Sequence, residues 1–447
     1  MVTPAPARVC LVLLAVALVL WAGEVRAQRT PNAGLSFEQA SARLGQVSDA
    51  LVAAGANVRS KAALSRATRN LRLPDVSLEA RQLRFEKSLE LGPLNATTAD
   101  WRFRPTASLA LPIYTGGRIP AAQQGAAASL RKAEAERDMV SQTVSVQLVQ
   151  TYFGLQLAVK AAAVRAQALE GLQGHVDHTV ALERQGFATK AQRLQATVSR
   201  DQAERERQRA LSDLATAREA LANLLHTEDP IIPTTGLFVI CTPLASVEDF
   251  QREALARHPQ LAELTAVQDE AAQAVRARQA ELKPQAYAFS QYDLYKHDAL
   301  LTESNWAFGV GLQYLVFTGN GRRDRVTAAR DQYDQAGATI RDTRERLETA
   351  VAKAWNDLET ARQTFLLLES SIASAEENVR LQDLSFREGQ ATSLDVIDAR
   401  LGLARAQIER SQSAYQFDLA LAQLLELSGQ ADRFPEYLRR ADRVIEP

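Results

Sequence analysis

Few residues in this sequence form a pattern that is typical of a catalytic or metal-binding site. His175 and His178 flank Asp177 and form a cluster that could bind a transition metal, but no third ligand is evident. We expect this pair to lie on the surface of a helix. The sequence also lacks a nucleophile motif, a phosphate-binding loop and a Cys-x-x-Cys pair. It therefore predicts no catalytic residue, no cofactor and no metal site, and the protein is not expected to be an enzyme.

Two carboxylates have a spacing that matters on a helix. Asp395 and Asp398 are at positions i and i+3, which share one helix face. Two Asp residues also favour the start of a helix, because negative charge is stabilising near its N-terminus. Whether the pair is functional or structural depends on the elements that hold it.

The composition of the 447-residue chain is typical of long helices. Ala, Gln, Arg, Glu and Leu dominate stretches that contain no proline. A formal net charge of -1 argues against a dedicated nucleic-acid binder, and a mean hydropathy of -0.21 argues against a helical-bundle membrane protein. The two cysteines are too few for a disulfide scaffold.

Residues 1–27 have the pattern of an export signal. Arg8 is followed by an apolar run that is shorter than the ~20 residues of a membrane span. A small-x-small site places cleavage after Ala27, with an uncleaved membrane anchor as the alternative. The mature chain, 28–447, then keeps only Cys241 and works outside the cytoplasm.

The sequence contains an internal repeat. The segment YTGGR at 114–118 recurs as FTGNGR at 317–322, and RQGFAT at 184–189 recurs as REGQAT at 387–392. Both pairs of motifs are 203 residues apart. Unrelated helices that are merely rich in Ala and Leu would not keep two glycine-containing motifs at one offset, so we interpret the chain as two tandem repeats.

Each repeat has the same predicted order of elements: a helix, a proline, a β-hairpin and a long helical hairpin. The first repeat spans 28–245 and the second 246–430, and 431–447 form a C-terminal tail. Opening helices are predicted at 36–72 and 247–283, strands at about 74–91, 101–114, 284–296 and 305–317, and helical hairpins at about 117–226 and 320–428. The first helix of each hairpin would span ~100 Å, more than a compact domain needs.

The second strand of each pair alternates bulky apolar residues with polar or small ones, the pattern of a strand with one apolar face. The first strand of each pair changes phase partway, as if a β-bulge intervened. Aromatic residues at both ends of the second strands suit the interfacial girdles of a membrane β-barrel: Trp101, Tyr114, Trp306 and Phe317. A soluble sandwich with an aromatic core is the alternative. Four strands cannot close a barrel, whereas three protomers would supply twelve.

The doubled order of elements, the export signal and the second turn, REGQATSLDVIDA at 387–399, resemble the TolC-type outer membrane efflux family, also called outer membrane factors. The resemblance covers essentially all of 36–430. It implies a mainly α fold with a membrane β-barrel, formed by a homotrimer. Each chain would contribute two tandem repeats to a 12-stranded barrel in the outer membrane and to a 12-helix α-barrel tunnel in the periplasm.

The resemblance also implies a function and partners. The chain would be the outer-membrane exit duct of an efflux or secretion system, working with an inner-membrane transporter and a periplasmic adaptor and contacting outer-membrane lipid. We favour small molecules or metal ions as cargo, and a duct for type I protein secretion is the alternative. A soluble periplasmic coiled-coil adaptor is the rival from another class, but it would need one hairpin and no strand pairs.

The residues of this chain that match the family's sites form three groups. Asp395 and Asp398 match an inward acidic pair at the periplasmic entrance, where three copies would place about six carboxylates and favour cations. The aromatic belt above is the second group. The third is the pair of tips that would meet the adaptor: Gly186, Phe187, Ala188, Thr189, Gly389, Gln390, Ala391 and Thr392.

One departure from the family pattern concerns closure of the entrance. Some members of the family use an Arg and a Tyr near the second tip, bonded to an Asp near the first. The matching positions here carry Ala391, Phe386 and Gln192, so this ionic lock is expected to be absent.

Overall fold

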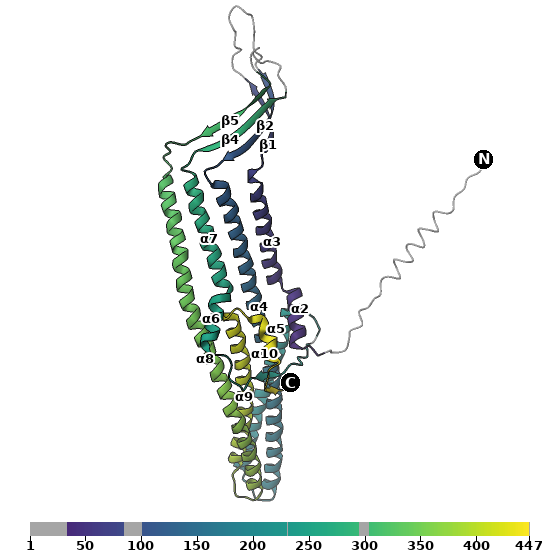
Figure 1. Cartoon of the computed structure of the whole chain (residues 1–447). Coiled ribbons are helices and arrows are strands. Elements are labelled where there is room, and N and C mark those ends of the chain that lie inside the picture. Colours follow the sequence, from purple (N-terminus) through teal and green to yellow (C-terminus); the bar gives the residue numbers. More distant parts are fainter. Residues whose placement is uncertain (1–33, 85–100, 230, 295–303, 447) are drawn as a thin grey trace, which may run out of the picture.

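A computed structural model gives the structure of the chain and describes residues 34–84, 101–229, 231–294 and 304–446. It is an elongated, mainly helical molecule. A four-stranded sheet lies at one end, and the two turns that connect the helices of each hairpin lie at the other (Figure 1). None of the described helices combines the length and the apolar composition that a membrane span requires. The predicted export signal at 1–27 lies outside the described residues.

The two helical hairpins give the molecule its length. In the first repeat, α4 (Arg118–Arg184) has 67 residues and α5 (Lys190–Leu224) has 35. In the second, α8 (Arg322–Arg387) has 66 residues and α9 (Ser393–Leu427) has 35. All four fall within the hairpin ranges that the repeat predicts. These helices are long because their sequences are rich in helix-forming residues and almost free of proline.

Heptad spacing packs these helices together. The buried side chains of α8 follow alternating steps of three and four residues: Leu347, Val351, Ala354, Leu358, Ala361 and Phe365. On α5, Ala196, Ala203 and Ala210 recur every seven residues. This is the spacing of coiled coils, and alanine at such positions lets helix backbones approach closely.

The opening helix of each repeat is broken, contrary to the single helix that the sequence pattern predicts. Instead of 36–72, the chain forms α2 (Phe37–Val47), α3 (Asp49–Arg69) and a short 3-10 turn, η1 (Asn70–Arg72). Instead of 247–283, it forms α6 (Val247–Arg257) and α7 (Pro259–Ala280). The break residues have extended backbones with ψ of 112° and 124°, and their side chains cap the following helix: Ser48 and His258.

A four-stranded antiparallel sheet forms from one hairpin of each repeat. Its strands are β1 (Asp75–Arg84), β2 (Trp101–Tyr114), β4 (Gln285–Asp293) and β5 (Trp306–Gln313), in the order β1-β2-β4-β5. The strand predicted at 305–317 is therefore too long. Gln313 pairs with Gln285, the first residue of β4, so residues 314–317 lie past the end of β4. The distal ends predicted for the first strands, 85–91 and 295–296, lie outside the described residues.

The bulges predicted in the first strand of each pair are also wrong. The register is continuous from Asp75 to Arg84 in β1 and from Gln285 to Tyr292 in β4. The apparent change of phase arises because apolar side chains lie on both faces of these strands. The sheet is irregular at another place, between Pro112 and Tyr114, where β2 shifts its register against β4.

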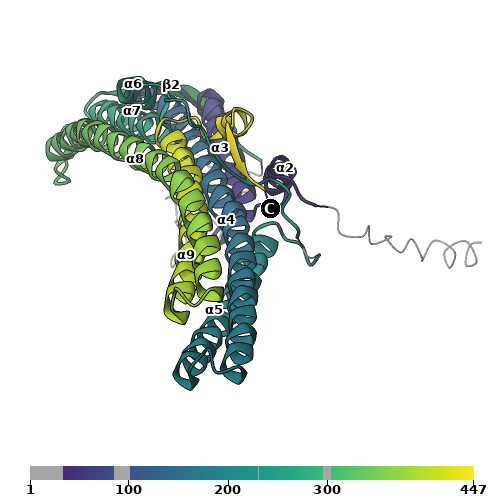
Figure 2. The same cartoon turned by 90° about the horizontal axis from the view of Figure 1, so that it is seen from below.

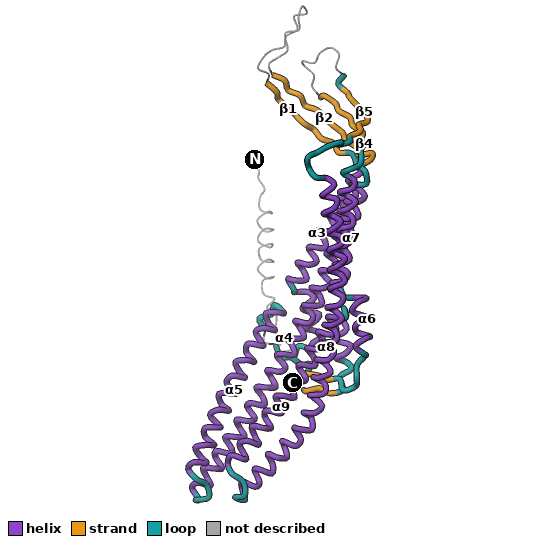
Figure 3. The backbone as a smooth tube through the Cα atoms, turned by 90° about the vertical axis from the view of Figure 1, so that its left-hand side faces the viewer, coloured by secondary structure: helices purple, strands orange, loops and turns teal. Residues whose placement is uncertain are grey.

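A compact middle region joins the two repeats at mid-height of the helices (Figure 3). The predicted C-terminal tail contributes a 3-10 turn, η3 (Ala431–Arg433), the helix α10 (Phe434–Leu438) and the strand β6 (Arg443–Ile445). β6 pairs with β3 (Leu237–Val239), which links the two repeats. The sequence did not reveal this small sheet, because strands of three residues carry too little periodic signal.

The helices are ordered differently in the two halves of the molecule. Near the sheet, neighbouring helices pack in the order α3-α4-α7-α8. Near the turns, the order is α5-α4-α9-α8. Viewed from below, the hairpins form one curved wall (Figure 2). Its edges are α3 and α5 on one side and α8 on the other, in line with the edge strands β1 and β5 of the sheet.

Candidate functional site

The two turns at the far end of the hairpins, called the first and second tip, are built in the same way. At the first tip, Gly186 has φ of 80°, and the amide of Phe187 donates to the carbonyl of Leu182 at 2.9 Å. Thr189 then caps α5 in a capping box with Gln192. At the second tip, Gly389 has φ of 74°, and the amide of Gln390 donates to the carbonyl of Ser385 at 2.8 Å. Glycine is favoured at both left-handed positions because it has no Cβ.

The second tip differs from the first in the residue that completes its capping box. Thr392 is the N-cap of α9, and Asp395 stands where the first tip has Gln192. The Asp395 Oδ2 atom accepts hydrogen bonds from the backbone amide and the hydroxyl of Thr392, each at 2.7 Å. These bonds hold the pKa of the Asp395 carboxyl below its usual range. Asp395 therefore has a structural role within one chain.

Asp398 has no such role. Both Asp395 and Asp398 are exposed, but Asp398 makes no hydrogen bond or ion pair with any other described residue. Asp398 is the sixth residue of α9, one turn beyond Asp395, and its side chain is open to solvent. The placement of the two groups at a pore entrance stays a prediction.

The tip surfaces are mostly exposed, as docking would require. Phe187 is 79% exposed, whereas its neighbour Ala188 is buried at 9%. Gly186, Thr189, Gly389, Gln390 and Thr392 are exposed, and Ala391 is half-buried. Exposure of a large apolar ring such as that of Phe187 to water is unfavourable in free energy for an isolated chain. The assignment of these residues to adaptor docking stays a prediction.

The expectation that His175 lies on the surface is wrong. Its side chain is 4% exposed, because α4 packs against α9 and the Phe386 ring of α8 lies beside it. Its Nε2 atom lies 2.7 Å from the hydroxyl oxygen of Ser393, and its ring lies 4.9 Å from that of Phe386. Burial foremost, and then the positive charge of Arg400, lowers the pKa of His175 to about 4. The first hairpin thus contacts the second through a neutral histidine.

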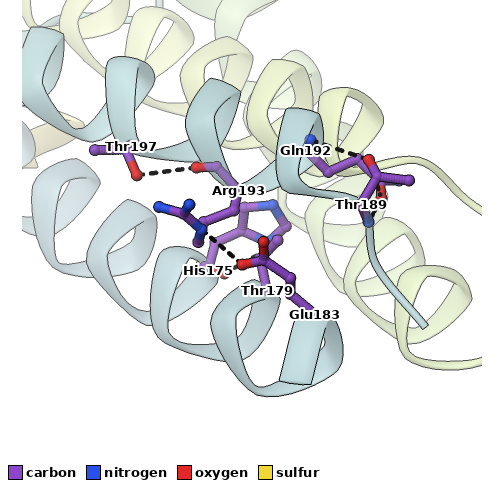
Figure 4. Close-up of polar contacts among 7 residues, drawn as sticks. All are labelled: His175, Thr179, Glu183, Thr189, Gln192, Arg193 and Thr197. Atoms are coloured by element: carbon purple, nitrogen blue, oxygen red, sulfur yellow. Dashed lines mark hydrogen bonds and ion pairs between the residues drawn. The ribbon is translucent and has the colours of Figure 1, made fainter. Parts of the chain in front are cut away.

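Ion pairs fasten the two helices of each hairpin near the tips. Arg193 Nε lies 2.6 Å from Glu183 Oε2 in the first hairpin, with Thr197 donating to the carbonyl of Arg193 (Figure 4). In the second hairpin, Arg400 Nη2 lies 2.6 Å from Asp383 Oδ2. A Cβ atom on Gly171 of α4 would collide with the Arg400 guanidinium, so this glycine admits the side chain between hairpins.

The sequence pattern does not predict the contacts of His175, Arg193 and Arg400. Each pairs residues across a turn or between repeats, and their partners are not at the same offset in the two copies. The Phe386 ring packs on His175, and Gln192 completes the cap of α5. These two side chains and that of Ala391 carry no charge, and the absence of the family's ionic lock stays a prediction.

The aromatic residues assigned to membrane interfaces lie at the ends of the sheet. Trp306 is the first residue of β5, is 55% exposed and packs edge-on against Tyr292 at 5.7 Å. Tyr114 ends β2 and is 49% exposed, whereas Phe317 lies beyond β5 and is 88% exposed. Trp101 opens β2, but its side chain lies outside the described residues. Their contact with lipid stays a prediction.

The sheet has one apolar and one polar face. Large exposed apolar side chains share one parity of the register: Val76, Leu78, Phe103, Phe308, Val310 and Leu312. On the other face, Arg104 Nη2 lies 3.6 Å from Asp293 Oδ2, and Thr106 donates to Asp293 at 3.0 Å. Both faces and both edges are open in a single chain. In the described part of the chain, no group of three His, Cys, Asp or Glu residues is placed to hold a metal ion.

Comparison with known proteins connects this architecture to a family. The outer membrane efflux protein BepC of Brucella suis biovar 1 (strain 1330) is 24% identical over 292 residues, covering 64% of this chain and 63% of BepC, less than two thirds of that relative. The structure of the outer membrane protein VceC from Vibrio cholerae matches with a TM-score of 0.75 at 20% identity, over 88% of this chain and 96% of VceC. The CmeC outer membrane channel of Campylobacter jejuni matches with a TM-score of 0.75 at 14% identity, over 94% and 95%.

These structural matches confirm the predicted fold class, with two repeats that each combine a β-hairpin and a long helical hairpin. The family model described as outer membrane efflux protein matches residues 41–226 and 251–430, which are most of both repeats. The chain belongs to the outer membrane efflux protein family.

Proposed function

We propose that three copies of this chain form a duct that carries small molecules or metal ions across the periplasm and out through the outer membrane. The observation that carries the proposal is the sheet. It has one apolar face, one polar face and two open edges, β1 and β5. An open sheet edge cannot stay in lipid, because its backbone amides and carbonyls would lack partners.

If copies of the same chain pair at these edges, the backbone amides and carbonyls gain hydrogen-bond partners and the sheet closes into a barrel. The edge formed by β1, α3 and α5 can meet the edge formed by β5 and α8 of the next copy. Three copies give twelve antiparallel strands, an even number as in bacterial barrels, with the apolar face toward lipid and the polar face toward the lumen. The same operation closes the hairpins into a tunnel with a seam between α5 and α8.

Exposed apolar side chains on the two edge helices support this seam. Leu194 and Val198 on α5 are 48% and 64% exposed, and Leu381 and Leu384 on α8 are both 46% exposed. The two pairs lie at similar heights above their tips, so a neighbouring copy would bury them against one another. Such burial contributes about 25 cal/mol for each Å² of apolar surface removed from water.

The far end of the tunnel would hold the partners and the entrance. An adaptor would dock on the two exposed tips, where Phe187 offers an apolar anchor, and an inner-membrane transporter would deliver the cargo. Asp398, together with Asp395, would give the entrance a negative potential from about six carboxylates, which attracts cations.

Membrane fractionation and conductance together test the duct. The full chain should stay in the outer-membrane fraction after a carbonate wash, and the purified trimer should give discrete conductance steps in a planar lipid bilayer. A chain that the wash releases would contradict the membrane-spanning sheet. Retention without conductance would contradict the duct.

A further inference from the structure

Two aromatic side chains lie on the polar face of the sheet. Tyr287 and Phe289 on β4 share the parity of Asp293, which pairs with Arg104 and Thr106 on that face. Their partners on β5 are Gly311 and Gly309, whereas the bulky residues of β5 lie on the opposite face. The two rings therefore stand out against a polar surface.

The two glycines make room for these rings. A Cβ atom built on Gly311 would lie 2.5 Å from the Tyr287 Cζ atom, and one on Gly309 would lie 3.2 Å from the Phe289 Cζ atom. Each ring thus lies across the neighbouring strand, directly over a glycine. Any larger residue at Gly311 would push the Tyr287 ring away.

The rings and their small neighbours form one open apolar surface. Tyr287 and Phe289 have ring centroids 6.1 Å apart and planes inclined by 47°, and they stay 40% and 39% exposed. On the side of β2, their register partners are Pro112 and Ala110. We call these six residues the aromatic patch: Ala110, Pro112, Tyr287, Phe289, Gly309 and Gly311.

We infer that the aromatic patch binds planar aromatic cargo on the wall of the pore; this inference rests on the proposed function, which turns the polar face toward the lumen. Each ring has one side on the strand backbone and leaves the other open to water. A planar aromatic solute can lie against that open side in an offset or edge-on arrangement and lose part of its contact with water.

The aromatic patch lies where cargo would enter the barrel. Tyr287 is the third residue of β4, next to the junction between sheet and helices. Three copies would place six rings at one level, where the sheet begins. Cargo that leaves the helical tunnel would meet this level before the rest of the barrel.

Block of the ionic current by a neutral probe tests the inference. We would add 2-naphthalenemethanol to wild-type channels in a planar bilayer and determine its apparent Kd from the current, with its saturated decalin analogue as the non-planar reference. The double variant Tyr287→Ser/Phe289→Ser should raise the Kd of the naphthyl probe by about fivefold or more. Tyr287→Phe, which keeps the ring, should leave it within about twofold.

Gln291→Ser is the matched control, because Gln291 lies on the same strand and face but outside the patch. It should leave the Kd unchanged. An unchanged Kd in the double serine variant, or equal binding of the decalin analogue, would overturn the inference while the wild-type conductance left the duct standing. Absence of wild-type conductance would instead contradict the proposed function. If the serine variant does not assemble, Tyr287→Leu/Phe289→Leu keeps the apolar volume, lacks the aromatic faces and must show the same rise.

Discussion

At the scale of single residues, the tips combine structural and electrostatic roles in the same few side chains. Asp395 completes a capping box and also carries charge, whereas Asp398 does only the second. His175 is the reverse case, a titratable group that is kept neutral so that it can pack between hairpins. Separating these roles needs substitutions that remove one property and keep the other.

The two tips themselves supply such a substitution for Asp395. Asp395→Gln copies the capping box of the first tip, where Gln192 occupies the same position, so the helix start is kept while the charge is lost. Combined with Asp398→Asn, it should lower the cation-to-anion permeability ratio by at least about twofold, because the field of the entrance carboxylates disappears. Reversal potentials in a salt gradient measure this ratio.

Asp395→Ala is the contrasting variant, since it removes both the charge and the cap. It should lower the thermal stability of the hairpin as well as the selectivity, whereas Asp395→Gln should leave the melting temperature unchanged. Unaltered selectivity in the Gln/Asn double variant would remove both residues from the entrance.

The buried His175 should make the contact between hairpins sensitive to acid. Its pKa is about 4 in the folded chain and 6.5 as a free side chain, so the unfolded segment binds more protons between these values. Stability is therefore complete above pH 6.5 and is lost as the pH falls toward 4. At pH 5 we expect a loss of about 2 kcal/mol, or roughly a thirtyfold larger equilibrium constant for opening.

Hydrogen exchange of residues 393–400, corrected for the intrinsic effect of pH, measures this opening. In His175→Gln, which cannot titrate, the protection should be lower at pH 7 and should no longer depend on pH. The exposed His226 provides the control, because His226→Asn should keep the acid sensitivity of the wild type. Equal pH dependence in His175→Gln would assign the effect to other groups.

At the scale of elements, the order α5-α4-α9-α8 predicts which helices meet between chains. In a Cys241→Ser background, Leu194→Cys with Leu384→Cys should form disulfide-linked trimers under mild oxidation, because both residues are exposed, on edge helices and at similar heights above the tips. Non-reducing gel electrophoresis detects the species of three chains.

A second exposed residue, farther along α8, provides the control for this crosslink. Leu367 is also exposed on α8, but it lies 17 residues from Leu384, or ~25 Å along the helix. Leu194→Cys with Leu367→Cys should therefore stay uncrosslinked. Crosslinking of this pair, or its absence in the first, would contradict the proposed seam.

At the scale of the whole molecule, the C-terminal tail fastens the two repeats together. The Phe434 ring lies 5.2 Å from Phe37, 5.9 Å from Phe153 and 5.7 Å from Phe238, so it fills the centre of the middle region. Phe434→Ala should destabilise the chain by about 3 kcal/mol, since it leaves a cavity among these rings. Thermal denaturation in detergent compares it with Val444→Ala, an exposed tail residue, which should melt close to the wild type.

The repeat, the long helices and the two-faced strands could be predicted from the sequence, because each leaves a regular spacing of residue types along the chain. Glycine at the tips and heptads on α8 specify geometry within a few residues. The contacts between distant segments are visible only in the folded chain. His175 and Ser393 are 218 residues apart, the β3-β6 pair joins two very short strands, and the rings of Tyr287 and Phe289 find their place over glycines of another strand. Such contacts leave no period in the sequence, since they depend on how whole helices and strands pack in space.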